Sequence, residues 1–153
     1  MSIKFTHINI VCKSCEVLAK FYQDVFECTP LSQPKEMVGS WINKGTGVKN
    51  ARVKSLHLKL PGLDKSAPTI EISEYNPSED KQNSLSNRIG FGHIAFCVDD
   101  VEATREKVLQ SGGFNLGEIS KHEFTGVGEL TFIYMKDPEG NIVEIQKWKK
   151  LSE

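Results

Sequence analysis

Two histidines and two glutamates occupy matched places in the sequence and are its strongest candidates for chemistry. His7 lies in FTHINIV and His93 in FGHIAFCV, each two positions after a phenylalanine. Glu71 lies in TIEISEY and Glu144 in IVEIQKW, each between two β-branched residues. Imidazoles and carboxylates suit a first-row divalent metal ion, and four such ligands leave two positions of an octahedral ion for water or substrate.

These matches belong to an internal repeat, in which the segment from Phe5 is similar to the segment from Phe91. The glutamate segments align at a shorter offset than the histidine segments, which predicts an extra stretch in the first half, within residues 32–55. A lone histidine or glutamate is usually structural, but the same pair at matched positions of two halves is much harder to attribute to chance. Duplication alone could still preserve the pair without a metal.

Helix and turn signals separate the strands of each half. Helices are predicted over residues 15–27 and 101–111, with Ser14 as the N-cap of the first and Asp99 or Asp100 as that of the second. The stretch KDPEGN, residues 136–141, favours a hairpin turn, because proline suits its first position and glycine tolerates a positive φ. Each half is therefore predicted to contain a strand, a helix and further strands.

Strand alternation predicts the direction of the candidate ligands. The isoleucines beside His7 and Glu71 should face the helix of the first half, so both polar side chains should face the other side of the sheet. The same argument applies to His93 and Glu144 in the second half. All four side chains would point into one concave face if the two sheets join.

With its motifs FGHIAFCVDDVEA and MKDPEGNIVEIQ, the chain resembles the vicinal oxygen chelate superfamily, which includes glyoxalase I, methylmalonyl-CoA epimerase, extradiol dioxygenases and bleomycin-resistance proteins. The resemblance implies an α+β fold of two tandem βαβββ modules, forming a curved mixed sheet around a metal-centred cavity. The single domain of residues 1–153 would then hold module 1 at about 3–76, a polar linker at about 77–88 and module 2 at about 89–149.

The resemblance also implies an activity. In its metal-dependent isomerase branches, the positions of His7, Glu71, His93 and Glu144 bind one divalent ion, such as Ni, Co, Zn, Mn or Fe. The implied function is a glyoxalase I-like lyase or isomerase (lactoylglutathione lyase-like). It would enolise a small, anionic carbonyl substrate, with Glu144 and Glu71 as candidate catalytic bases. A homodimer is expected from the same resemblance.

Other activities in the same superfamily remain alternatives. An epimerase of the methylmalonyl-CoA type places a further glutamate in the middle of its first module, whereas residues 38–62 contain no Asp or Glu here. An extradiol-type dioxygenase uses two histidines and one carboxylate, so a fourth ligand, Glu71, argues against it. Non-catalytic drug-binding resistance proteins generally lack the metal ligands, so a complete set favours catalysis.

Residues 38–62, which contain no Asp or Glu, form a basic segment that provides candidate substrate-binding residues. Arg52 and Lys54 would fall on one face of a strand, and His57 with Ser55 on the other, so only one set can face the cavity. The functional interpretation is a positive lip for an anionic substrate, and the structural one is an exposed strand protected by its lysines. His122 is expected in a polar loop, and the glycines of residues 124–130 suggest a mobile flap.

The motif Cys12-Lys13-Ser14-Cys15 has the spacing of a thioredoxin-type redox pair and lies before a predicted helix, where a thiolate is favoured. Val98 and Val101 stand at the matching places of the second half, so a plain strand-to-helix junction is the favoured interpretation. With one such pair among four cysteines, cysteine alone cannot build a four-thiolate zinc site.

Composition excludes several classes of partner. A net charge of -1 and a pI of about 6.4 do not indicate binding to nucleic acid or to an anionic membrane. No apolar run approaches a membrane span, and the first residues are too short and polar for a signal peptide. A cytoplasmic protein with reduced thiols is expected.

Overall fold

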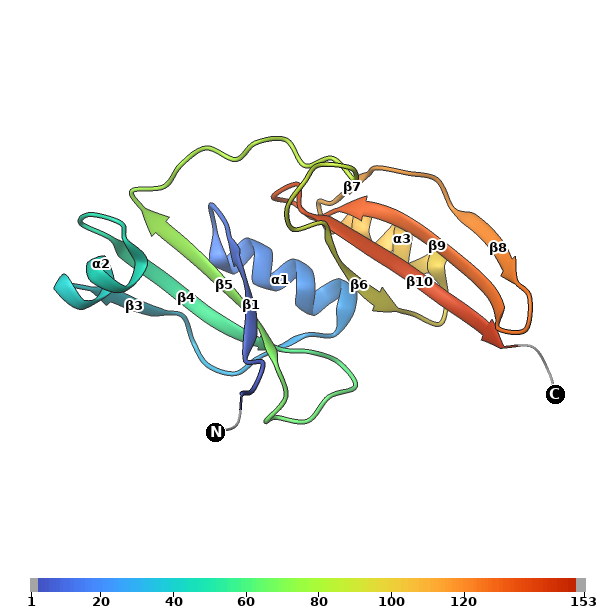
Figure 1. Ribbon diagram of the computed structural model, residues 1–153, viewed down its shortest axis with the longest axis horizontal. Coiled ribbons are helices and arrows are strands. Elements are labelled where there is room, and N and C mark those ends of the chain that lie inside the picture. Colours follow the sequence, from blue (N-terminus) through green and yellow to red (C-terminus); the bar gives the residue numbers. More distant parts are fainter. Residues whose placement is uncertain (1–2, 151–153) are drawn as a thin grey trace. The chain divides into compact units, whose positions relative to one another are not determined.

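The computed structural model describes residues 3–150, and the chain divides after Lys81 into two compact units. This boundary lies inside the predicted polar linker, and each unit contains one copy of the repeat (Figure 1). No helix in the described range is both long and apolar enough to cross a membrane.

Unit 1 is built on a five-stranded sheet in the order β1-β5-β4-β2, with β3 also paired to β4. Strand β1 is parallel to β5, and the other pairs are antiparallel. Helix α1 packs against β4 and β5 (Figure 1). The elements are β1 (His7–Val11), α1 (Cys15–Phe26), β2 (Thr29–Pro30), β3 (Lys35–Val38), α2 (Ser40–Thr46), β4 (Arg52–Lys59) and β5 (Thr69–Asn76).

Unit 2 repeats this design with the order β6-β10-β9-β7, and β8 also pairs with β9. Strand β6 is parallel to β10, as β1 is to β5. Helix α3 packs against β9 and β10. The elements are β6 (His93–Cys97), α3 (Val101–Gln110), β7 (Phe114–Asn115), β8 (Ser120–Phe124), β9 (Gly128–Lys136) and β10 (Ile142–Lys150). The two tandem βαβββ modules are thereby confirmed, with the first strand after each helix broken into two short pieces.

The two long helices begin in the same way. The Ser14 side chain accepts from the backbone N–H of Val17, and the Asp100 side chain accepts from that of Ala103. Both capping residues have nearly the same extended backbone, with φ and ψ of -143° and 111° for Ser14 and of -140° and 108° for Asp100. The predicted caps are confirmed, and each helix ends one residue earlier than expected.

The extra stretch of the first half contains helix α2, inside the predicted interval. Ile42 of α2 packs in a small apolar cluster with Val53 and Ala51, joined by Met37 and Tyr75. Met37 pairs with Val53, and Val53 with Tyr75, so all three strand residues share one face of the sheet. Helix α1 packs on the opposite face, so α2 covers one end of the face that α1 leaves open.

The polar loop predicted around His122 is wrong, because residues 120–124 form strand β8. The pairing of His122 with Leu130 places it in an antiparallel hairpin with β9. The glycines of residues 124–130 lie at the turn of that hairpin, where the backbone N–H of Val127 donates to the carbonyl oxygen of Phe124. All five residues of β8 are exposed, so its strand is held by backbone pairing with β9 and not by an apolar face.

Candidate functional site

The first histidine–glutamate pair lies on the open face of the unit 1 sheet. His7 on β1 and Glu71 on β5 belong to neighbouring parallel strands, and His7 Nε2 lies 3.3 Å from Glu71 Oε2. The buried isoleucines on either side of Glu71 point to the helix side, as predicted. The side chain of Glu71 is 18% exposed, so a solute can still reach it.

The second pair repeats this geometry in unit 2. His93 on β6 and Glu144 on β10 lie on neighbouring parallel strands, with His93 Nε2 2.9 Å from Glu144 Oε2. The residues beside Glu144 on its strand are again buried. The structure therefore brings together the predicted residues of each half, one pair in each unit.

A further residue joins each pair from the next strand of the sheet. His57 pairs with Glu71 across β4 and β5, and its ring lies 5.3 Å from that of His7. Its Nε2 lies 3.7 Å from Glu71 Oε1. Tyr134 has the equivalent place in unit 2, where it pairs with Glu144 and its ring lies 4.8 Å from that of His93.

His57 thus has a counterpart in the second half, although that counterpart is a tyrosine. The internal repeat does not show this equivalence, because His57 lies outside the matched segments, beyond the inserted helix α2. The signal that could have found it is the antiparallel register from β4 to β5, which sets His57 opposite Glu71.

The surroundings of the two glutamates differ. Asn9 on β1 donates from Nδ2 to Glu71 Oε2 at 2.9 Å and to Ser73 Oγ at 2.7 Å. In unit 2 the position equivalent to Asn9 is Ala95, which has no polar side chain. Glu71 is consequently held by an amide that Glu144 lacks. Asn9 was missed in the sequence, although its position two residues after His7 puts it on the same strand face.

Two hydroxyl groups complete the polar environment. Thr69 Oγ1 lies 2.8 Å from Nδ1 of His57, and Thr6 Oγ1 lies 3.2 Å from Nδ1 of His7. Because these hydroxyl groups contact Nδ1, the Nε2 atoms of His7 and His57 both point toward Glu71. In unit 2, burial and the negative charge of Glu144 raise the pKa of Tyr134 above the usual value for a phenol.

The donor types of each pair suit a divalent metal ion. Each pair presents an imidazole nitrogen beside a carboxylate oxygen, a combination that suits first-row metals. Among residues 3–150, no group of three or more His, Cys, Asp or Glu side chains is arranged to hold a metal. Neither pair would fill the coordination sphere of an ion alone.

Arg52 and Lys54, the two cations predicted to bind substrate, lie on the face of β4 opposite His57. Their strand positions alternate with that of His57, and both are paired with carboxylates. Arg52 Nη2 lies 2.8 Å from Glu36 Oε1, and Lys54 contacts Glu16 on α1, which lowers the pKa of Glu16. Of the basic segment, Lys59 is the cation that shares its face with His57.

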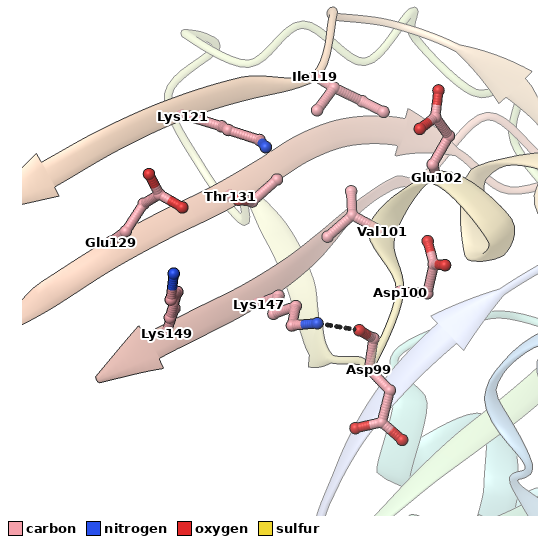
Figure 2. A pocket seen from close by; sticks show the side chains of 10 residues that line it. All are labelled: Asp99, Asp100, Val101, Glu102, Ile119, Lys121, Glu129, Thr131, Lys147 and Lys149. Carbon is pink, nitrogen blue, oxygen red and sulfur yellow. Dashed lines mark hydrogen bonds between the residues drawn. The ribbon is translucent and has the colours of Figure 1, made fainter. Parts of the chain in front are cut away.

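A hollow of about 320 Å³ lies in unit 2, on the α3 side of the sheet (Figure 2). Its strand residues alternate with Tyr134 and Glu144 and so belong to the opposite face. Acids and lysines are mixed around it, and Lys147 Nζ donates to the carbonyl oxygen of Asp99 at 2.5 Å (Figure 2). The lining residues are Asp99, Asp100, Val101, Glu102, Ile119, Lys121, Glu129, Thr131, Lys147 and Lys149. Neither His93 nor Glu144 lines this hollow.

Solved structures share this fold. A glyoxalase family protein from Bacillus cereus is 17% identical and aligns with a TM-score of 0.80, covering 97% of this chain and 95% of that one. The fosfomycin resistance protein FosX from Listeria monocytogenes is 19% identical, with a TM-score of 0.58 over 97% of this chain and 96% of that one. A FosX variant complexed with Mn(II) and 1S,2S-dihydroxypropylphosphonic acid is 18% identical, with a TM-score of 0.56 over 95% and 92% of the two chains.

The sequence matches no curated protein. The family profile described as Glyoxalase/Bleomycin resistance protein/Dioxygenase superfamily matches residues 4–145, nearly the whole chain. The family expected from the motifs is confirmed, and the chain belongs to the glyoxalase/bleomycin resistance protein/dioxygenase superfamily, the vicinal oxygen chelate superfamily.

Proposed function

We propose that this protein is a metal-dependent lyase or isomerase of the glyoxalase I type, which moves a proton next to the carbonyl group of a small substrate. The observation that carries the proposal is the repeated pair, with imidazole and carboxylate 3.3 Å apart in unit 1 and 2.9 Å apart in unit 2. His7, Glu71, His93 and Glu144 together would hold one divalent ion. Once bound, the ion would supply Lewis-acid stabilisation of the negative charge that develops on the substrate oxygen.

Glu144 is the better candidate for the residue that removes the proton. Glu71 accepts a hydrogen bond from Asn9, which restrains its carboxylate, whereas Ala95 offers no such donor to Glu144. A base must reach the substrate C–H and then carry the proton to its new position, so the less restrained carboxylate suits this role. Glu71 would mainly act as a ligand and remains the second candidate base.

The substrate is proposed to carry an anionic group as well as a carbonyl. Lys59 lies on the same face of β4 as His57 and is partly exposed, so it is a candidate partner for that group. His57 would contact the substrate beside Glu71, with its ring held through Nδ1 by Thr69. Arg52 and Lys54 could contribute to long-range attraction, since their paired side chains face away from Glu71.

Metal binding is the first test. The metal-free protein is titrated by calorimetry with Ni(II), Co(II), Zn(II), Mn(II) and Fe(II) in turn. Mn(II) is included because the structurally similar FosX variant was solved as a complex with it. One ion per chain is expected. His7→Ala and His93→Ala should each weaken binding by more than roughly 100-fold, since each removes a direct ligand. His122→Ala is the matched control and should bind normally.

Two outcomes would count against this arrangement. Two ions per chain, with one lost in each histidine variant, would show that the pairs are separate sites. Unchanged affinity in both variants would show that the metal binds elsewhere or not at all.

Proton transfer is the second test. The loaded protein is incubated in D₂O with the hemithioacetal of methylglyoxal and glutathione, with 2-methyl-branched acyl-CoA and with simple α-hydroxy ketones, and C–H exchange next to the carbonyl is followed by NMR. Exchange with at least one class is expected, and Glu144→Gln should abolish it. If that variant keeps full exchange with its metal bound, the base assignment is wrong.

The same assays separate the alternatives. Exchange with the acyl-CoA alone would indicate an epimerase, and oxygen uptake with catechols an extradiol-type dioxygenase. Tight binding of a drug by the metal-free protein, without turnover, would indicate a resistance protein. The homodimer expected from the resemblance is checked by light scattering in the same buffers.

A further inference from the structure

The Cys-x-x-Cys motif lies at the junction of β1 and α1, and the structure brings its thiols together. Cys12 follows the last residue of β1, and Cys15 is the first residue of α1. Both are buried thiols outside any disulfide, with 8% of Cys12 and none of Cys15 exposed to solvent. A hydrogen-bonding contact with the Cys12 side chain lowers the pKa of Cys15 below its ordinary value.

Both sulfurs lie against consecutive carbonyl groups of strand β5. Cys15 Sγ lies 3.5 Å from the carbonyl oxygen of Ile72, and Cys12 Sγ lies 3.6 Å from that of Ser73. Cys15 Sγ also lies 3.2 Å from the carbonyl oxygen of Lys54. These contacts set the two sulfurs against consecutive residues of β5.

The other cysteines have no such arrangement. Cys97 is exposed at the end of β6, and burial raises the pKa of Cys28 to about 12, so that it stays a neutral thiol. In unit 2, the positions that match the pair are valines, Val98 and Val101. The valines support an equivalent helix start, so the fold of the junction does not itself require cysteines.

We propose that Cys12 and Cys15 form a redox site, which a peroxide oxidises reversibly to a disulfide. The inference does not depend on the proposed metal or on the proposed reaction. It goes beyond a plain strand-to-helix junction, because the two buried sulfurs lie against consecutive residues of the same strand.

The oxidation balances with hydrogen peroxide as the oxidant. Cys12, the sulfur nearer to solvent, attacks one peroxide oxygen, the O–O bond breaks, and hydroxide leaves with the thiol proton as water. Cys15 then attacks the sulfur of the Cys12 sulfenic acid, the S–O bond breaks, and hydroxide takes the Cys15 proton and leaves as a second water. Two thiols thus lose two electrons to the peroxide, and a dithiol reductant reverses the change.

A peptide map tests the proposal on the unmodified full-length chain. Lys13 lies between the cysteines, so trypsin separates them into FTHINIVCK and SCEVLAK. Reduced protein is treated with equimolar hydrogen peroxide, quenched in acid, alkylated in denaturant, digested and analysed by mass spectrometry. The two peptides should appear joined and unalkylated, and dithiothreitol should separate them. Cys28 should remain fully alkylated.

Two variants sharpen the result. Cys97→Ser should keep the cross-link, whereas Cys15→Ser should lose it and leave Cys12 as a sulfenic acid that dimedone traps. The proposal is overturned if both peptides are recovered separately and fully alkylated while Cys97 is oxidised. It is also overturned if either peptide is joined only to the peptide that contains Cys28 or Cys97.

Discussion

The amide of Asn9 is bound to the carboxylate of Glu71, with Nδ2 2.9 Å from Oε2. The same nitrogen donates to Ser73 Oγ at 2.7 Å, so the side chain bridges two residues of the neighbouring strand. All three side chains lie on the face opposite α1. Asn9 therefore fixes the direction of the Glu71 carboxylate before any ligand arrives, which makes it a positioning residue for the proposed metal site.

Loss of this amide should weaken metal binding without removing a ligand. Asn9→Ala is expected to lower the metal affinity by about 10- to 100-fold, the usual cost of losing the partner of a metal-binding carboxylate. Calorimetry of the metal-free protein measures this directly. Ser73→Ala, which removes the second bond of Asn9, should have a smaller effect in the same direction.

Asn115→Ala provides the control, because Asn115 lies exposed on β7 in unit 2. Its affinity should equal that of the unmodified protein. If Asn9→Ala also binds normally while His7→Ala does not, the positioning role is wrong and the metal site stands. If neither variant changes affinity, the metal site itself is wrong.

The sequence predicts much of this fold because local signals and the internal repeat agree. Ser14 and Asp100 are the capping residues expected from their types, and each starts a helix. The alternation of apolar residues around Glu71 and Glu144 fixes which face of each strand is buried. A shift of the strand register by one residue would expose the neighbouring isoleucines to solvent. Helix caps and strand faces depend on residues that are close together in the chain, so the sequence shows them directly.

Relationships across strands were harder to predict. The neighbourhood of His57 and Glu71 depends on the register of β4 with β5, which no short motif specifies. Helix α2 stands in the intervening stretch of the first half and hides the equivalence of His57 with Tyr134. The relative placement of distant strands is set by packing of the whole unit, so these residues became visible only in the structure.

Asp137 should be important for the stability of the β9–β10 turn. Its buried Oδ1 accepts from the backbone N–H groups of Glu139 and Asn141, both at 2.9 Å, and Oδ2 accepts from Asn141 Nδ2 at 2.8 Å. Asp137→Ala would leave these donors without their partner. We expect a loss of about 2–3 kcal/mol in the free energy of unfolding, measured with urea.

Asp64 makes a similar turn in solvent and serves as the comparison. Its Oδ1 accepts from the backbone N–H and hydroxyl of Ser66, at 2.8 and 2.6 Å, but the residue is exposed. Asp64→Ala should cost much less, because water can replace the carboxylate. Equal losses in the two variants would show that burial does not set the importance of these turns.

Cys28 should make the protein sensitive to alkaline pH. Its pKa is raised from 9.0 to about 12 by burial, so between these values the unfolded chain releases a proton that the folded chain retains. The stability contributed by the neutral thiol is full below pH 9 and falls as pH rises toward 12. Urea unfolding at pH 8 and at pH 10.5 should show a larger decrease for the unmodified protein than for Cys28→Ala. An identical decrease in both proteins would contradict this assignment.

Two glycines of the β8–β9 hairpin should respond differently to substitution. Gly126 and Gly128 have φ values of 77° and 143°, which residues other than glycine rarely adopt. A methyl group on Gly126 would meet no atom within 4 Å, whereas one on Gly128 would clash with the backbone carbonyl oxygen of Lys149 on β10. Backbone strain alone should cost Gly126→Ala about 1–2 kcal/mol.

The clash adds to that strain at Gly128, so Gly128→Ala should cost about 3 kcal/mol or more. Urea unfolding can be followed by tryptophan fluorescence, because the ring of Trp148 on β10 lies 5.6 Å from that of Phe124 on β8. Because Gly128 pairs with Lys150 at the end of β10, its variant should raise the exposure of Trp148 above the native 40% and shift its emission to longer wavelength. Equal losses in both variants would mean that β10 moves aside freely, and that close contact between these strand ends does not hold the hairpin in place.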